Sequence, residues 1–301
     1  SEGLMPTDHV VSDGRRVYLS NARGVRCFTE DGYQLWSEAG TRPFANPSED
    51  EIRAFSRVGG NVGNFRLWTA FEEDMEGRLS VLGDTLYRIE GSWATGKRRV
   101  RTGSGRNVSY KHIRSGSRIV AYDKDSGVQR YVLGGGLEGD EGVLSGARFL
   151  NAPVPCGRRM LAAYEQNDAL HMLAFDPGTG EILWTRTLCS YPTSEGPPQA
   201  PAGLLVDSGT VYVSPGQGVV FTLDGYTGSV ARAFVYERLA EDASYRNRRG
   251  GHSHSSWKEN ALFLAAGKLL VVPADAQALL AFDVVSGRRA YRVDSKKAEY
   301  P

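Results

Sequence analysis

The chain alternates short apolar runs with compact polar turns, and this pattern recurs along its length. Leu170, Met172 and Leu173 lie in one apolar run, and a second run ending at Trp184 follows the turn 176–180, Asp-Pro-Gly-Thr-Gly. In such turns Asp and Thr side chains bond to nearby backbone N–H groups, Pro fixes one φ angle, and the closing Gly adopts positive φ without strain. The pattern predicts a β-hairpin over this stretch.

Four degenerate copies of this turn accompany it, and each of the five units also opens with an earlier Gly turn. The later turns contain Gly32, Gly127, Gly180, Gly228 and Gly287, and the earlier ones contain Gly14, Gly83, Gly157, Gly209 and Gly267. The two turns are about 20 residues apart in four units and about 44 apart in the second, so the second unit carries an insertion between its second and third strands. Each unit is expected to hold four strands.

Repeating four-stranded units of about 50 residues are typical of a β-propeller, in which small antiparallel sheets bury their faces against their neighbours. We therefore predict an all-β fold, a β-propeller of four-stranded antiparallel blades, as a single domain over residues 1–301. The five recognisable blades are expected at about 8–37, 78–133, 149–187, 202–236 and 261–293, with a basic insertion at 91–117.

Residues 174–184 resemble the Ala-x-Asp-x-x-Thr-Gly-x-x-x-Trp repeat of PQQ-like (quinoprotein-type) β-propellers at every fixed position. In that family the last aromatic residue packs onto the next blade. The resemblance therefore implies inter-blade docking by Trp36, Tyr131, Trp184 and Tyr291, while Arg232 replaces the aromatic residue in the fourth unit and puts that joint in question. Because the family's rings have six to eight blades, we expect an excerpt of a longer chain, with a closed five-bladed ring as the alternative.

Composition narrows the function classes. A net charge of +1 predicts no global attraction to nucleic acid or membrane, and no apolar run is long enough for a transmembrane helix. The first residues lack the features of a signal peptide. Cys27, Cys156 and Cys189 are too few and too scattered for a disulfide framework or a zinc site, and we expect no bridge between Cys156 and Cys189.

Loop lengths single out one end of the blades. In a four-stranded meander the first and third turns lie at one end, and the second turn and the crossover to the next blade lie at the other. The long segments all fall at the second end, which we call the long-loop face: 37–76, 91–117, 134–147, 188–201 and 237–260. Binding residues gather on loops held by a rigid scaffold, so this face is the candidate binding surface.

The insertion 91–117 is rich in basic residues and contains no acidic ones. Its candidate partner-binding residues are Lys97, Arg98, Arg99, Arg101, Arg106, Lys111 and Arg114, together with Trp93 and Tyr110. One interpretation is a contact surface for an acidic protein or another polyanion, such as a polysaccharide. The other is a solvated ribbon whose charge meets acidic neighbours on the same face. Specific nucleic-acid binding is not expected, because no recognition module accompanies the charge.

Candidates for catalysis and metal binding are few. His252 and His254 alternate on one segment and could ligate a metal, but no third ligand can be assigned, and an exposed polar crossover is the alternative. A dehydrogenase of the resembled family would need PQQ, calcium and an Asp base, whereas the Asp residues at 123, 176, 224 and 283 are explained by their turns. We therefore expect no catalytic residue and no cofactor.

The leading hypothesis is a non-catalytic protein-interaction or assembly scaffold that uses the long-loop face and binds a protein partner or a larger assembly. The resemblance implies an extracytoplasmic location, in the bacterial periplasm or cell envelope. The alternatives are a PQQ- and calcium-dependent oxidoreductase and a polyanion or polysaccharide binder that uses the basic insertion.

Overall fold

Short apolar runs between Gly turns form antiparallel strands throughout the computed structural model of the protein. The structure describes residues 6–21, 24–39, 77–91, 94–101, 108–114, 116–136, 141–190, 201–238, 259–276 and 278–294. Within these ranges the regular elements are β-strands, and no helix occurs. Alternation of buried and exposed positions is weak in the inner strands. β6, for example, is buried at all six positions, although it includes the charged residues Arg88 and Glu90, so both faces of this strand are covered.

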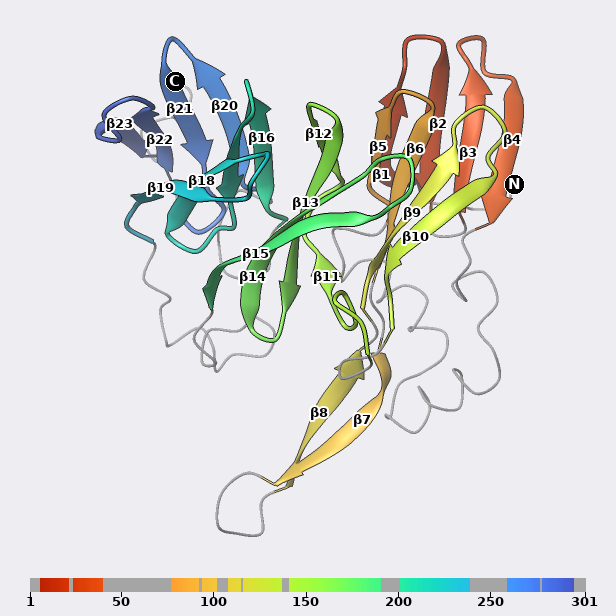
Figure 1. Ribbon diagram of the computed structural model, residues 1–301, viewed down its shortest axis with the longest axis horizontal. Helices are drawn as coiled ribbons and strands as arrows, with labels where there is room; N and C mark the ends of the chain where they lie inside the picture. The colour runs from red at the N-terminus through yellow and green to blue at the C-terminus, as the bar shows by residue number, and fades with distance from the viewer. Residues whose placement is uncertain are drawn as a thin grey trace. The chain divides into compact units, whose positions relative to one another are not determined.

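The strands follow one another in the order shown by the colour ramp of Figure 1. They are β1 (Pro6–Ser12), β2 (Arg16–Asn21), β3 (Gly24–Thr29), β4 (Gln34–Ala39), β5 (Leu79–Leu82), β6 (Thr85–Glu90), β7 (Ala94–Arg101), β8 (Val108–Arg114), β9 (Arg118–Asp123), β10 (Gln129–Gly134), β11 (Arg148–Phe149), β12 (Val154–Cys156), β13 (Arg159–Gln166), β14 (Ala169–Phe175), β15 (Ile182–Ser190), β16 (Gly203–Asp207), β17 (Thr210–Ser214), β18 (Val219–Asp224), β19 (Val230–Val235), β20 (Ala261–Ala265), β21 (Lys268–Val272), β22 (Ala278–Asp283) and β23 (Arg289–Asp294).

Five of the sheets have the strand order of a propeller blade. Their orders are β1-β2-β3-β4, β5-β6-β9-β10, β11-β13-β14-β15 with β12 also paired to β13, β16-β17-β18-β19, and β20-β21-β22-β23. The hairpin β7-β8 forms its own two-stranded sheet and lies in the chain between β6 and β9, the second and third strands of the second blade. This confirms the predicted all-β propeller class with four-stranded antiparallel blades.

The chain divides into two compact units. The first contains Ser1–Pro153, Tyr164–Gln166 and Asp176–Glu181, and the second contains Val154–Ala163, Asn167–Phe175 and Ile182–Pro301. The first two blades belong to the first unit, the last two belong to the second, and the third blade contributes residues to each. The single domain over 1–301 and the number of blades in the ring stay predictions.

Apolar side chains of neighbouring blades pack together within each unit. In the first unit Tyr18, Cys27, Leu86, Val120 and Tyr122 lie in one buried cluster drawn from both blades. In the second unit a corresponding cluster joins side chains of the fourth and fifth blades. Each fully buried side chain of this size contributes about 1.5–3 kcal/mol, so the blades are held together mainly face to face. All three cysteines are free, and Cys27 is fully buried, in keeping with a small core residue.

The turn between the third and fourth strands is built by one carboxylate. Asp176 Oδ1 accepts hydrogen bonds from the backbone N–H groups of Gly178 (2.8 Å) and Thr179 (2.9 Å) and from Thr179 Oγ1 (3.1 Å). Gly180 N donates to Asp176 O at 2.9 Å, and Gly180 has a φ of 77° that favours glycine. The same carboxylate arrangement recurs at Asp123, Asp224 and Asp283.

The first blade closes this turn differently. Thr29 takes the place of the Asp, its Oγ1 accepts the N–H of Tyr33 at 3.0 Å, and Gly32 N donates to Thr29 O at 3.0 Å. The turn is one residue shorter than the other four, so the recurring carboxylate motif is absent from this blade while the closing Gly, with a φ of 85°, is kept.

Replacing Asp176 by Ala removes three hydrogen bonds of its turn and is expected to destabilise the protein by about 1 kcal/mol, the usual cost of losing such a side-chain cap. The midpoint of urea unfolding measures the effect. Glu181→Ala is the matched control, because it removes the same charge just before β15 without removing a side-chain hydrogen-bond acceptor of the turn. Equal midpoints for the two variants would contradict this account of the turn.

Candidate functional site

The predicted docking residues Trp36, Tyr131 and Trp184 each stand four residues after a turn Gly and reach the turn Gly of the following blade. The ring of Trp36 lies 2.7 Å from the position that a Cβ atom on Gly127 would occupy. Its Nε1 donates to Lys124 O at 3.0 Å. The indole therefore covers the Gly and satisfies a turn carbonyl in one contact.

Tyr131 makes the same contact one blade later. Its ring lies 2.6 Å from the Cβ position of Gly180, and its hydroxyl donates to Pro177 O at 2.8 Å. Tyr87 donates to the same carbonyl at 3.3 Å. Burial raises the pKa of Tyr131, so its hydroxyl remains a donor at physiological pH.

In the second unit the same contact with a turn Gly is made once by an aromatic side chain and once by an arginine. Trp184 lies 2.8 Å from the Cβ position of Gly228, and its buried Nε1 has no hydrogen-bond partner among the described residues. Arg232 covers Gly287 at 2.9 Å, and its Nη1 donates to the carbonyls of Val284 (3.0 Å) and Val285 (2.9 Å). The guanidinium thus occupies the aromatic position that the sequence left in question. Tyr291, in the same position of the last blade, is 42% exposed.

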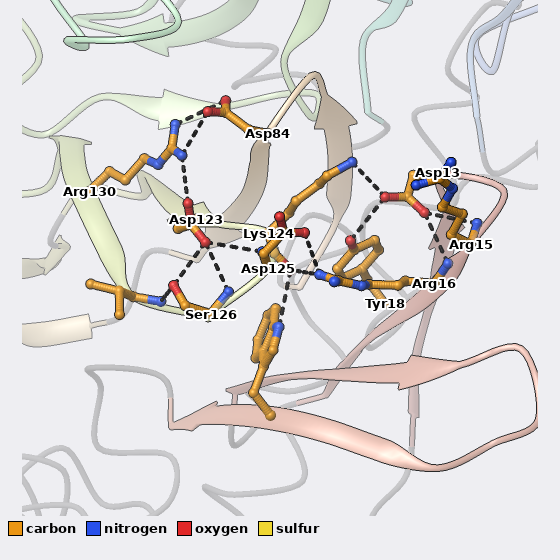
Figure 2. Close-up of polar contacts among 12 residues, drawn as sticks. Asp13, Arg15, Arg16, Tyr18, Asp84, Asp123, Lys124, Asp125, Ser126 and Arg130 are labelled. Atoms are coloured by element: carbon orange, nitrogen blue, oxygen red, sulfur yellow. Dashed lines mark hydrogen bonds and ion pairs between the residues drawn. The ribbon is translucent and has the colours of Figure 1, made fainter.

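An ion-pair exchange between the first two blades was not predicted from the sequence. Lys124 Nζ donates to Asp13 Oδ2 at 2.7 Å, and Arg16 Nη1 pairs with Asp125, so each blade offers one acid and one base to the other (Figure 2). Tyr18 Oη also donates to Asp13 Oδ2, at 3.2 Å. The hydrogen bond from Lys124 is the main cause that holds the pKa of Asp13 below its usual range.

Figure 2 also shows a second ion-pair group within the second blade, where Arg130 joins two turns. Its Nη2 donates to Asp84 Oδ2 at 2.9 Å and to Asp123 Oδ2 at 2.6 Å. Hydrogen bonds from Arg130 and then from Ser126 lower the pKa of Asp123. The charged groups at this end of the blade therefore hold turns in place.

A buried charged network lies at the two ends of the basic insertion. Arg88 and Glu90 are each 1% exposed, and Arg88 Nη1 pairs with Glu90 Oε1 at 2.8 Å. Arg88 Nε donates to Ser20 Oγ of the first blade at 3.0 Å, and Arg118 pairs with Glu90 Oε2 at 2.6 Å. Glu90 and Arg118 flank residues 91–117 in the chain, so this ion pair fixes the two strands from which the insertion leaves.

The basic insertion contains a regular hairpin. Lys97, Arg98, Arg99 and Arg101 lie on β7, and Tyr110, Lys111 and Arg114 lie on β8. The register pairs Arg98 with Lys111 and Arg99 with Tyr110, so the antiparallel pairing brings the basic positions of the two strands together at the level of the backbone. Trp93 and Arg106 fall outside the described residues. Partner binding by this group stays a prediction.

The predicted metal candidates His252 and His254 also lie outside the described residues. In the part of the chain that the structure describes, no three His, Cys, Asp or Glu side chains come close enough to hold a metal ion. A search of the same residues for a helix of sufficient length and hydropathy to span a membrane finds none.

The ion pair of Asp123 predicts a dependence of stability on pH. Because the folded state lowers the pKa of Asp123, its contribution is fully present above the unfolded-state value of about 3.9 and is lost as the pH falls toward the folded value. Asp123→Asn keeps an acceptor oxygen for the turn but removes the charge. We expect the urea midpoint of this variant to fall less steeply than that of the wild type between about pH 5 and pH 2.

Arg130→Gln tests the same pairing from the cationic side and is expected to reduce the steepness in the same pH interval. Part of the slope should persist in both variants, because Lys124 lowers the pKa of Asp13 in each of them. The contribution of Asp84 should persist only in Asp123→Asn, since the hydrogen bond from Arg130 is the main cause of its lowered pKa. Curves that run parallel to that of the wild type would contradict the assignment.

Comparisons with known proteins agree with this blade architecture. A family model described as outer membrane protein assembly factor BamB matches residues 5–249 and 171–300. No curated protein sequence matches the chain. Similar solved structures include BamB from Moraxella catarrhalis, a europium-containing methanol dehydrogenase, and the quinohemoprotein alcohol dehydrogenase from Comamonas testosteroni.

These structures share the fold at low sequence identity. BamB has a TM-score of 0.52 and 14% identity, the methanol dehydrogenase 0.54 and 12%, and the alcohol dehydrogenase 0.54 and 15%. They cover 97%, 97% and 95% of this chain, whereas the chain spans 63%, 53% and 42% of their respective lengths. Since the two matches of the family model together extend over nearly the whole sequence, the chain belongs to the PQQ-like repeat family whose model is described as outer membrane protein assembly factor BamB.

Proposed function

We propose that the chain is a non-catalytic assembly scaffold that binds a protein partner through the long-loop face, in the periplasm or cell envelope of a bacterium. The observation that carries the proposal is the match of nearly the whole chain to a family described by an assembly role. Fold alone does not settle function, because the structural neighbours include both BamB and dehydrogenases.

The first and third turns of the blades form the end opposite the long-loop face, which we call the tight-turn end. The way its polar groups are used supports the choice of face. There Asp13, Asp123, Lys124 and Arg130 engage one another or their own turns. Groups that hold the scaffold together are poor candidates for binding a partner, because releasing them would loosen a joint. Recognition then falls to the opposite end of each blade, where the second turns and the crossovers leave the sheets.

The basic insertion gives the long-loop face its chemical character. It carries seven basic residues and no acidic ones, and it leaves the second blade from strands held by the buried ion pairs of Glu90. Because these strands hold the two ends of the insertion in place, less entropy is lost on binding, and clustered Arg side chains pair well with carboxylates. The partner that fits is a protein with an acidic surface. A polysaccharide or other polyanion is the alternative ligand for the same residues.

The oxidoreductase alternative would require PQQ, calcium and an Asp base. The repeat carboxylates do not fit these roles, because Asp123, Asp176, Asp224 and Asp283 each accept N–H and hydroxyl groups of their own turns. These carboxylates are oriented toward backbone donors, and we assign no reaction step to them.

A triple substitution tests the proposed surface. The partner is first identified as a protein that co-purifies with the chain. Arg98→Ser, Arg99→Ser and Arg101→Ser together are expected to weaken binding of that protein at least about tenfold at low salt, because surface charge pairs act over a screening length of about 10 Å. Affinity is measured by titrating the purified partner at two salt concentrations. Unfolding should be unaffected, since the substitutions lie on a separate hairpin.

The matched control removes three exposed arginines from the tight-turn end, as Arg15→Ser, Arg158→Ser and Arg288→Ser. It has the same net charge as the test variant and should bind as the wild type does. Equal loss in both variants would show that total charge, not the insertion, matters. Native mass spectrometry of the purified protein completes the test, because stoichiometric release of a quinone with calcium would overturn the scaffold proposal.

A further inference from the structure

The hairpin β7-β8 is a two-stranded sheet, and neither of its strands pairs with a further strand among the described residues. It belongs to the first compact unit and lies in the chain between β6 and β9, away from both ends of the sequence. A two-stranded hairpin is marginally stable in water, and its outer edges carry backbone N–H and C=O groups that a third strand can pair with. Strand addition is therefore a mode of binding that this hairpin offers.

Basic residues occupy alternate positions along β7. The register of the hairpin is unbroken from residue 97 to residue 101. Because successive positions of a strand alternate between its two faces, Lys97, Arg99 and Arg101 share one face and follow one another at intervals of about 7 Å. Arg98 lies on the other face, opposite Lys111.

The charge of the hairpin restricts which strand can be added. Residues 91–117 contain no Asp or Glu, and the register places Arg98 directly opposite Lys111. Like charges in opposite positions repel, and basic residues along an edge disfavour pairing with a second copy of the same strand. A strand that carries carboxylates meets neither obstacle and adds attraction at each matched position.

We propose that the outer edge of β7 binds an extended acidic segment of a partner protein as an added strand, with carboxylates at alternate positions opposite Lys97, Arg99 and Arg101. The inference rests on the proposed function, since it specifies how the basic insertion recognises its acidic partner. In this mode backbone hydrogen bonds supply affinity and the alternate positions supply specificity. It requires acidic residues with a period of two, whereas attraction by total charge requires no pattern.

Two synthetic peptides of identical composition, both with blocked termini, test the pattern. One alternates Glu with Thr, and the other contains the same residues as a Glu block followed by a Thr block. Fluorescence anisotropy with the full chain at low salt is expected to show at least about tenfold tighter binding of the alternating peptide. Equal affinities, or binding of neither peptide, would overturn strand addition. The titration with the co-purifying protein decides the proposed function separately.

Two variants with the same net charge identify the face of the hairpin. Arg99→Thr with Arg101→Thr removes two charges from the face of the alternating series, and Arg98→Thr with Lys111→Thr removes two from the other face. Thr favours strands, so the hairpin is kept in both variants. The first variant is expected to bind the alternating peptide at least about tenfold more weakly than the second. An equal loss in both would contradict the assigned face.

Amide hydrogen exchange identifies the edge. In an antiparallel hairpin the N–H groups of each strand point alternately to the partner strand and to the outer edge. The outward amides of β7 are expected to exchange rapidly in the free protein and at least about tenfold more slowly with the alternating peptide in excess, while those of β8 keep their rates. Slowing confined to β8 would overturn the assignment to β7. Slow exchange at the β7 edge of the free protein would show that another segment already covers it and would overturn the proposal.

Discussion

The structure depends on a close contact that only glycine permits. In the second to fifth blades the third turn ends with a Gly of positive φ, and a side chain of the preceding blade lies close to the position that a Cβ atom would occupy, as Tyr131 does over Gly180. In three of these four joints the covering residue also donates to a carbonyl of that turn, as Tyr131 does to Pro177. Backbone conformation and packing thus meet at one position of each joint, and a hydrogen bond is usually added, which explains why the turn motif persists while the rest of the repeat varies.

The sequence predicted the features that are local in the chain. Turn, strand and docking residue lie within about 10 residues, so the repeat is recognisable locally, and its resemblance to the PQQ-like repeat implied the docking role of Tyr131 and Trp184. The sequence did not predict that Arg232 would make the same contact with the next blade. The pattern was defined by an aromatic residue, whereas the contact needs a side chain that covers a Gly and donates to carbonyls. The pairing of Asp13 with Lys124 joins residues far apart in the chain and leaves no local signal.

The two ends of the blades differ in what their polar groups do. At the tight-turn end, charged side chains such as Arg130 hold turns to one another. At the other end, the buried pairing of Arg88, Glu90 and Arg118 anchors strands that lead into a basic hairpin. Each ion of such a buried network loses its hydration, and this cost offsets much of the attraction between the charges. The scaffold and the proposed binding surface are therefore supported by different residues.

A double-mutant cycle between Tyr131 and Gly180 tests the central claim most directly. The free energy of unfolding is measured for the wild type, Tyr131→Ala, Gly180→Ala and the double variant, and the backbone strain of Ala at a φ of 77° cancels in the cycle. If the ring occupies the place of a Cβ atom, Gly180→Ala should cost about 1 kcal/mol or more less once Tyr131 is shortened. Equal costs in the two backgrounds would contradict the account.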